Sequence, residues 1–364
     1  MRRIIYWLLG LVPLTLAVRF AFPEHQTIIF GLSALSMIPL AQLLSEATEN
    51  LAARTGPTFG ALLNVTFGNA GELVIGFFAL REGLQNIVKA SITGSILVNL
   101  LLTLGISMIG GGLRHKTLKF NALGARNQAT MLALAAISLI FPAAYRLLAG
   151  NTAGTHEADL SLEFAFVLLI TYGLSLLFSL HTHHQLLSAA PEESGHEEVW
   201  SASKSLLLLV VSAVFVGWMG EVLVGSVEES AKSLGLTDLF VGIIIVAVAG
   251  NAAESTSAIR AALKNRMDLS VGIGIGSSLQ IALFVAPGLV ILSHWIGHAP
   301  MNLVFTPAEL VALVLTIAIT GQIAGDGESN WFEGVQLIAV YLMLAVMFYY
   351  LPAPEQTAIL PAPR

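Results

Sequence analysis

The chain has 364 residues, of which 55% are hydrophobic and only 11% are charged, and its formal net charge is −6. Soluble domains carry about 25% charged residues, so a water-facing surface over this length is excluded and lipid is expected to be the solvent for most of the chain. The absence of cysteine excludes disulfides, thiolate metal sites and cysteine nucleophiles, and nucleic-acid binding has no support because no basic patch is interleaved with aromatic residues.

Apolar runs long enough to cross a bilayer recur from one end of the chain to the other. A transmembrane helix needs about 20 apolar residues, and about eleven such runs are present, with short connections between them. The pattern predicts an all-α polytopic membrane protein. The spans are expected near residues 4–22, 27–47, 57–81, 86–112, 127–148, 162–181, 203–227, 236–262, 269–296, 304–324 and 332–351.

The first run begins with basic residues, as a signal peptide does. Because Arg19 interrupts its end and no small-x-small cleavage site follows, we expect it to remain as an N-terminal transmembrane helix within residues 1–26.

Lysine and arginine residues indicate the orientation, because they favour the cytoplasmic side of a membrane. Of the 17 basic residues, eleven fall on the side of the N-terminus and six on the opposite side. The N-terminus is therefore predicted to be cytoplasmic and the C-terminus external. The cell (inner) membrane is the expected location.

One longer polar stretch, residues 183–202, separates two blocks of five predicted helices. It is interpreted as a solvated acidic linker or as a regulatory segment that attracts cations. His181, His183 and His184, at the start of this stretch, form a solvated interfacial cluster or a pH sensor. The expected division is a first helix over 1–26, five-helix blocks over 27–182 and 203–351, the linker between them, and a tail over 352–364.

An internal repeat is the most informative feature of the sequence. Segments 60–95 and 242–277 match at a constant spacing of 182 residues, the spacing from Glu72 to Glu254. Both contain Gly-Asn-Ala-x-Glu, and Asn69 corresponds to Asn251. The two copies lie on the third and the eighth predicted spans, and because this offset of five is odd they are predicted to cross the membrane in opposite directions. Inverted repeats of this kind are typical of secondary transporters, whose substrate site lies near the midplane where the repeats meet.

The two repeated acids are the candidate chemical centre. A charge at membrane depth costs about 2.5–3.5 kcal/mol on insertion scales, so an intramembrane glutamate indicates function by default. Glu72 and Glu254 are each three residues after an asparagine, which places acid and amide on one helix face. Ca²⁺ takes about 6–8 oxygen ligands, and the lack of His or Cys nearby argues against a softer metal.

The same pair of acids suits proton coupling. A desolvated carboxyl group favours its neutral form, whereas a bound cation favours the ionised form. Protons and a divalent cation would then compete for Glu72 and Glu254, and that competition amounts to exchange without a separate proton site.

Further polar residues accompany both motifs. A second layer is predicted from Ser95 and Asn99 in the first copy and from Ser277 and Gln280 in the second, although hydrogen bonding between helices explains these four residues equally well. Two acids at the same 182-residue spacing are candidates for the access path. They are Glu46 and Glu228.

The sequence resembles the calcium/cation–proton exchanger family of the cation/calcium exchanger superfamily. The resemblance rests on GNAGELVIGFFALREG at 68–83 and GNAAESTSAIRAALKNRMD at 250–268, with further likeness at 92–105 and 275–287. It implies one N-terminal helix plus two inverted five-helix repeats. It also implies a cation site on Glu72 and Glu254, assisted by Asn69 and Asn251, and the segment around residues 192–198 looks like that family's acidic helix.

Other functions are left as alternatives. A Na⁺-coupled exchanger is the closest of these, but Na⁺-coupled members tend to carry Ser/Thr and Pro before the motif acid, so Asn-Ala-x-Glu favours protons. The sequence lacks the HExxH, GxSxG or paired intramembrane Asp motif that an intramembrane enzyme would need. Duplicated inverted halves argue against a passive channel. The expected partners are Ca²⁺, H⁺ and the lipid bilayer, no resident cofactor is expected, and assembly into a homo-oligomer is left open.

Overall fold

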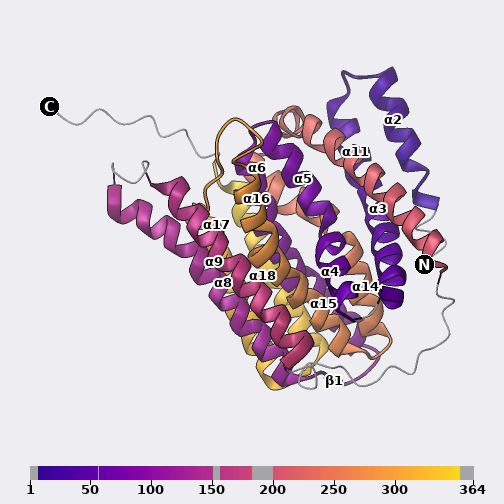
Figure 1. Cartoon of the computed structure of the whole chain (residues 1–364), viewed down its shortest axis with the longest axis vertical. Coiled ribbons are helices and arrows are strands. Elements are labelled where there is room, and N and C mark those ends of the chain that lie inside the picture. Colours follow the sequence, from indigo (N-terminus) through magenta and orange to yellow (C-terminus); the bar gives the residue numbers. More distant parts are fainter. Residues whose placement is uncertain (1–6, 56, 151–155, 183–199, 353–364) are drawn as a thin grey trace.

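The computed structural model describes residues 7–55, 57–150, 156–182 and 200–352. These residues form an almost entirely helical bundle (Figure 1), which confirms the all-α prediction. The linker over 183–199, the tail over 353–364 and the first six residues lie outside the described part, and so do His183, His184 and the acidic segment around 192–198.

The helices fall into two sets that the 183–199 segment separates. The first set is α2 (Leu11–Ala21), α3 (Gln26–Thr55), α4 (Pro57–Gly68), α5 (Ala70–Arg81), α6 (Gln85–Leu97), the π-helical η1 (Val98–Thr103), α7 (Leu104–Gly112), the strand β1 (Leu118–Lys119), α8 (Ala122–Ala149), α9 (Glu157–Leu177) and the π-helical η3 (Phe178–Thr182). The second set is α11 (Ala202–Leu234), α12 (Asp238–Phe240), the π-helical η4 (Val241–Val246), α13 (Ala247–Gly250), α14 (Ala252–Leu263), α15 (Met267–Gln280), the π-helical η5 (Ile281–Val285), α16 (Ala286–Leu292), α17 (Pro307–Asp326), the strand β2 (Glu328–Ser329) and α18 (Trp331–Tyr350).

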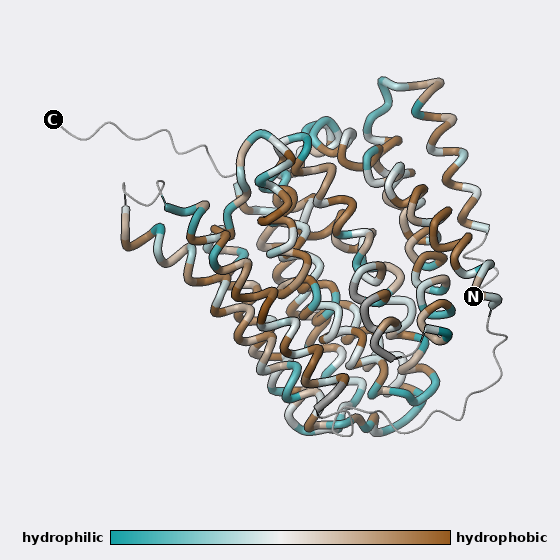
Figure 2. Tube along the Cα trace, viewed as in Figure 1, coloured by the Kyte–Doolittle hydropathy of each residue, from teal (hydrophilic) through white to brown (hydrophobic). Residues whose placement is uncertain are grey.

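The described helices include eight that are long and apolar enough to cross a membrane, and a ninth span if the bent pair 238–250 and 252–263 is counted as one. The predicted span over 57–81 is divided into α4 and α5, and the described part of the first span is the short helix Leu11–Ala21. The count of eleven spans is therefore not confirmed. Hydrophobic residues fill the middle of the bundle and polar residues gather at its two ends (Figure 2), as expected for a chain that crosses a bilayer.

Helix starts follow local sequence signals at the ends of the bundle. Thr306 caps α17 and forms a capping box with Glu309, while Asn330 caps α18 and Ser201 caps α11. Each cap satisfies backbone N–H groups that a helix leaves without partners at its start. At one end of the bundle, β1 and β2 pair as a short antiparallel ladder.

The internal repeat is visible in the structure as well as in the sequence. Helices α6 and α15 begin at Gln85 and Met267, positions 182 residues apart. Both continue into a π-helical segment, and the helices that precede them are interrupted at Asn69 and Asn251. Equivalent breaks in equivalent spans indicate that the two halves share one architecture.

Contacts between the halves show how the central helices run. Ala90 lies beside Gly242 at the start of the paired segments, and Thr103 hydrogen-bonds Ser255 thirteen residues later in each. The span from α6 to α7 therefore runs parallel to the span from α12 to α14. Because α5 and α6 form a hairpin joined only by residues 82–84, the two motif-bearing helices α5 and α14 run in opposite directions, as predicted from the offset of five spans between the motifs.

A glycine makes the contact between α6 and η4 very close. A β-carbon at Gly94 would overlap the carbonyl oxygen of Ile243 and would lie 2.7 Å from the β-carbon of Ala247. Membrane helices have no hydrophobic driving force for association and rely on such close backbone packing. Two long helices, α3 and α11, lie side by side and cover the motif helices, with α3 against α14 and α11 against α5 (Figure 1).

Candidate cation site

The two motif acids occupy equivalent places just after the helix breaks. Asn69 has φ −108° and ψ 29°, and Asn251 has φ −91° and ψ 12°, so the backbone leaves the helical conformation at both residues. Helices α5 and α14 then restart, with Glu72 and Glu254 in their first turns. The free N–H groups and the helix dipole at such a start favour negative charge.

Both acids point into protein rather than into lipid. Glu72 is only 6% exposed. Glu254 is half-buried, its Oε2 atom is shielded from solvent, and its carboxyl group lies within electrostatic range of Glu72. The antiparallel halves therefore bring the two predicted acids to one region.

Several oxygen atoms in this region are buried without a hydrogen-bond partner among the described residues. They are Glu72 Oε1 and Oε2, Glu254 Oε2, Asn69 Oδ1 and Asn99 Oδ1. Burying an ionised carboxylate without a partner is strongly unfavourable, so these acids require either a proton or a cation. Oxygen atoms without competing donors are also the ligand type that Ca²⁺ selects.

The motif amides are held by the second layer that the sequence predicts. Asn251 Oδ1 accepts a hydrogen bond of 2.8 Å from Asn99 Nδ2, and Asn251 Nδ2 donates one of 2.7 Å to Ser95 Oγ. In the other half, Asn69 Nδ2 donates to Gln280 Oε1. Each motif asparagine is thus oriented by a residue from the opposite half.

The backbone of the second motif lies directly against the first acid. A β-carbon at Gly250 would lie 3.4 Å from Glu72 Oε1, and one at Gly71 would lie 3.4 Å from the Gly250 carbonyl oxygen. Within the described part of the chain, no group of three His, Cys, Asp or Glu side chains is arranged to hold a metal ion. A cation between Glu72 and Glu254 would therefore need amide, backbone carbonyl or water oxygens as its remaining ligands.

A cavity of about 270 Å³ leads to only one of the two acids. We call it the acidic cavity, and its lining residues are Ser45, Glu49, Asn64, Gly68, Glu254, Ser257, Leu269, Gly272, Ile273, Gly276, Ser277 and Gln280. It extends from Glu254 toward the end of the bundle where α3 and α14 finish and α15 begins, which is the side predicted to be cytoplasmic. Glu72 does not line it, so the described conformation presents Glu254 to that side.

The remaining predicted residues are placed differently. Ser277 lines the acidic cavity. Glu46 is buried at 8% exposure and accepts a hydrogen bond of 3.1 Å from Gln42, whereas Glu228 is exposed on α11. Neither of these two acids lines the acidic cavity, and their access role remains a prediction.

Some residues of the site were not among the sequence candidates. Thr103 and Ser255 join their hydroxyl groups across the two halves at 2.6 Å. Each lies four residues after a candidate, Asn99 or Asn251, so helical spacing was an available signal. Glu49, near the end of α3, lines the acidic cavity together with Glu254.

Comparison with known proteins decides the family. The sodium/calcium exchanger protein family matches residues 25–181 and 204–350, which is most of the chain. The chain belongs to the sodium/calcium exchanger family. This exchanger is 43% identical over 367 residues to the "Ca(2+)/H(+) antiporter" of Aphanothece halophytica, a match that covers 97% of this chain and 98% of the relative. It is also 42% identical over 328 residues to the "Ca(2+)/H(+) antiporter ChaA" of Bacillus subtilis, covering 89% and 92% of the two chains.

Solved structures agree with the fold of the exchanger. The structure of native YfkE superposes with a TM-score of 0.83 at 37% identity, covering 95% of this chain and all of that one. The crystal structure of the H⁺/Ca²⁺ exchanger CAX matches with a TM-score of 0.66 at 18% identity, which supports the fold alone.

Proposed function

We propose that this exchanger transports Ca²⁺ in one direction and H⁺ in the other across a membrane, by alternating access. It is a secondary transporter rather than an enzyme, and its relatives at 42–43% identity are named Ca²⁺/H⁺ antiporters. With an inward proton gradient it would expel Ca²⁺ from the cytosol. Sodium-coupled exchange is not favoured, because those relatives are proton-coupled by name.

The observation that carries the proposal is the pair of buried carboxyl groups without partners among the described residues. Three of their four oxygen atoms, both of Glu72 and one of Glu254, are shielded from solvent and accept no hydrogen bond there. A divalent cation neutralises two carboxylates, and two protons neutralise the same two groups. In both of these states the buried negative charge is neutralised, whereas a site with neither cation nor protons is unfavourable. The site therefore carries the cation or the protons whenever it changes from one side of the membrane to the other.

The roles of the individual residues follow from their contacts. Glu72 and Glu254 hold either the cation or the protons. Asn69 and Asn251 supply amide oxygens, and Ser95, Asn99 and Gln280 orient these amides. Ser277 offers a hydroxyl group in the acidic cavity, and we assign Glu46 and Glu228 to the access paths of the two halves.

The finer organisation is part of the same proposal. We assign the repeats to residues 27–182 and 203–351, after a first helix within 1–26 and around the acidic linker 183–202. The N-terminus would be cytoplasmic and the C-terminus external, in the cell (inner) membrane. A homo-oligomer is compatible with this arrangement, because the substrate site lies within one chain.

The test is a flux measurement on pure protein in lipid vesicles. Vesicles with an acidic lumen should take up Ca²⁺ in Na⁺-free medium, and the uptake should stop when a protonophore together with a K⁺ ionophore collapses the pH gradient. Uptake that requires a Na⁺ gradient and ignores the pH gradient would assign the chain to the sodium-coupled alternative. Ca²⁺ flux without counter-movement of protons would indicate a channel.

A further inference from the structure

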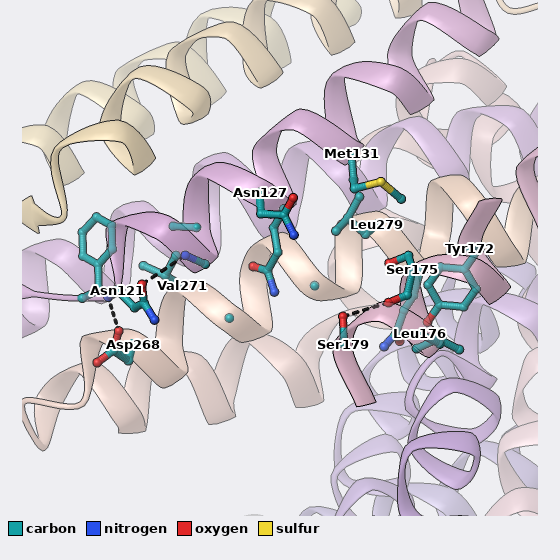
Figure 3. Close-up of a pocket in the computed structure, with 17 residues that line it drawn as sticks. Asn121, Asn127, Met131, Tyr172, Ser175, Leu176, Ser179, Asp268, Val271 and Leu279 are labelled. Atoms are coloured by element: carbon teal, nitrogen blue, oxygen red, sulfur yellow. Dashed lines mark hydrogen bonds between the residues drawn. The ribbon is translucent and has the colours of Figure 1, made fainter. Parts of the chain in front are cut away.

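A second cavity lies beside the proposed site, along an adjoining face of α15. It has a volume of about 280 Å³ and lies between α8, α9 and α15 (Figure 3). We call it the amide cavity after its main polar side chains. Asp268 and Asn121 lie at one end of it, Tyr172 and Ser175 lie at the other, and Asn127 lies between them (Figure 3).

The two cavities differ in charge. The acidic cavity contains two carboxylates, Glu49 and Glu254. The amide cavity is lined mainly by neutral amides, hydroxyls and apolar side chains, and its one carboxylate, Asp268, already accepts a hydrogen bond from the backbone of Asn121. A partly dehydrated divalent cation needs carboxylates to replace its water, so the acidic cavity suits Ca²⁺ and the amide cavity does not.

A single stripe of α15 separates the cavities. Gly272, Gly276 and Gln280 line both of them. These residues are spaced by four and so lie on one helix face, and a β-carbon at either glycine would meet no atom within 4 Å. Gln280, which interacts with Tyr172 on the side of the amide cavity, also accepts the hydrogen bond from Asn69 in the motif. The amide cavity therefore reaches the second layer of the site.

The dimensions and chemistry of the amide cavity suit a chain of water molecules. One water occupies about 30 Å³ of liquid volume and needs two to four polar partners, so a 280 Å³ cavity with this lining has room for several. The distance from Asp268 to Gln280 is twelve residues of helix, about 18 Å. Gln280 lies near the middle of the span Met267–Leu292. Water in the cavity would connect one membrane surface with the interior.

We propose that the amide cavity is a proton route, separate from the cation route through the acidic cavity. This inference rests on the proposed Ca²⁺/H⁺ exchange. On the side to which both cavities open, Ca²⁺ enters along Glu49 and Glu254 while protons leave the carboxyl pair as hydrated protons past Gln280. A divalent cation in the acidic cavity repels protons in the same space, and a second route removes that conflict.

The repeat-related position in the other half differs from the amide cavity. At the 182-residue spacing, Asn127 corresponds to Glu309 and Val271 corresponds to Lys89. That equivalent interface, between α6 and α17, is filled: Glu309 is 2% exposed and accepts a hydrogen bond of 3.3 Å from Thr93. The position equivalent to Asn127 is therefore packed, whereas Asn127 itself lines an open cavity, so the two halves differ here in the described conformation.

The test places leucine in one cavity at a time. Asn127→Leu and Ser175→Leu make the amide cavity narrower and apolar, and we expect them to lower the maximal exchange rate about fivefold or more while the Ca²⁺ concentration for half-saturation stays within about twofold. Ser257→Leu in the acidic cavity should do the reverse and raise the half-saturating Ca²⁺ concentration.

Matched variants separate blockage from misfolding. Thr130→Leu, on the exposed side of α8 outside both cavities, should exchange like the unchanged protein, and Asn127→Ser should retain activity because it keeps the cavity polar and open. If Asn127→Leu and Ser175→Leu exchange like Thr130→Leu, or raise the half-saturating Ca²⁺ concentration as Ser257→Leu does, the separate route is wrong.

A labelling experiment gives an answer that does not require transport. Because the chain has no cysteine, Asn127→Cys provides a single thiol in the cavity. A membrane-impermeant thiol reagent should modify it from one side of the membrane only, and modification should slow exchange. A thiol that resists the reagent from both sides would overturn the inference. If the unchanged protein shows no Ca²⁺ flux driven by a pH gradient, it is the proposed function that fails, and the labelling still reports on the cavity.

Discussion

Glu72 lies against the backbone of Gly250, so that a β-carbon at this glycine would be 3.4 Å from Glu72 Oε1. The two residues belong to different halves of the chain: Glu72 ends the first Gly-Asn-Ala-x-Glu motif and Gly250 begins the second. The glycine therefore leaves room beside a buried carboxylate for a ligand of that carboxylate.

Gly250→Ala tests this arrangement. The added methyl group fits at van der Waals distance, so the protein should fold, but it occupies space next to Glu72 that a hydrated or partly hydrated cation needs. We expect the half-saturating Ca²⁺ concentration to rise about tenfold, which corresponds to about 1.4 kcal/mol, in vesicle flux assays. Gly288→Ala, where a β-carbon meets no atom within 4 Å, is the control and should not change the exchange.

Removing either carboxylate charge should abolish exchange. Glu72→Gln and Glu254→Gln keep the size of the side chain but delete one charged ligand. Loss of one partner of a buried charge pair costs about 2–5 kcal/mol, so Ca²⁺ affinity should fall about 30-fold or more. Calorimetric Ca²⁺ titration in detergent and flux in vesicles measure the two effects separately. Undiminished exchange in either variant would remove that residue from the site.

The hydrogen bond from Asn99 to Asn251 should be energetically coupled to cation binding. Asn99→Ala leaves the buried Asn251 amide without the donor that orients it, and an unsatisfied buried polar group costs about 1–3 kcal/mol. A double-mutant cycle with Asn251→Ala should therefore show non-additive losses of Ca²⁺ affinity. Additive losses would mean that the two amides act independently.

The sequence predicted the parts of the site that a repeat can reveal. The 182-residue spacing selected both acids and both asparagines of the proposed site, and the offset of five spans predicted their opposite directions, which the contacts of Ala90 and Thr103 confirm. The spacing of Ser95 and Asn99 predicted a shared helix face, and both residues bind Asn251. These features depend only on spacing along the chain, within a helix or between the two repeats.

Spacing along the chain does not predict which residues of the two halves contact each other across the bundle. Asn99 and Gln280 are one position out of register between the repeats, so sequence spacing alone did not pair Gln280 with Asn69. The structure does pair them, through a hydrogen bond from Asn69 Nδ2 to Gln280 Oε1. The difference in access between Glu72 and Glu254 also depends on the conformation of the whole bundle, which a symmetric repeat does not encode.

Gly94 should be essential for packing rather than for binding. A β-carbon there would overlap the Ile243 carbonyl oxygen, so Gly94→Ala must push α6 away from η4, and overpacking of this kind costs about 1–3 kcal/mol. We expect a lower midpoint of thermal unfolding in detergent and a poor yield of folded protein. A midpoint equal to that of the Gly288→Ala control would contradict the close packing.

The dependence of Ca²⁺ affinity on pH should reveal how many protons compete at the site. Where both acids are protonated in the absence of Ca²⁺, binding one cation displaces two protons, and the half-saturating Ca²⁺ concentration should rise up to about 100-fold for each unit by which the pH falls. With Glu72→Gln one titrating group is lost, so any residual binding should change by at most about tenfold per unit. Equilibrium Ca²⁺ titrations at several pH values measure both slopes. A half-saturating concentration that does not change with pH would show that protons and Ca²⁺ do not share these carboxylates, and coupling would then require separate binding groups.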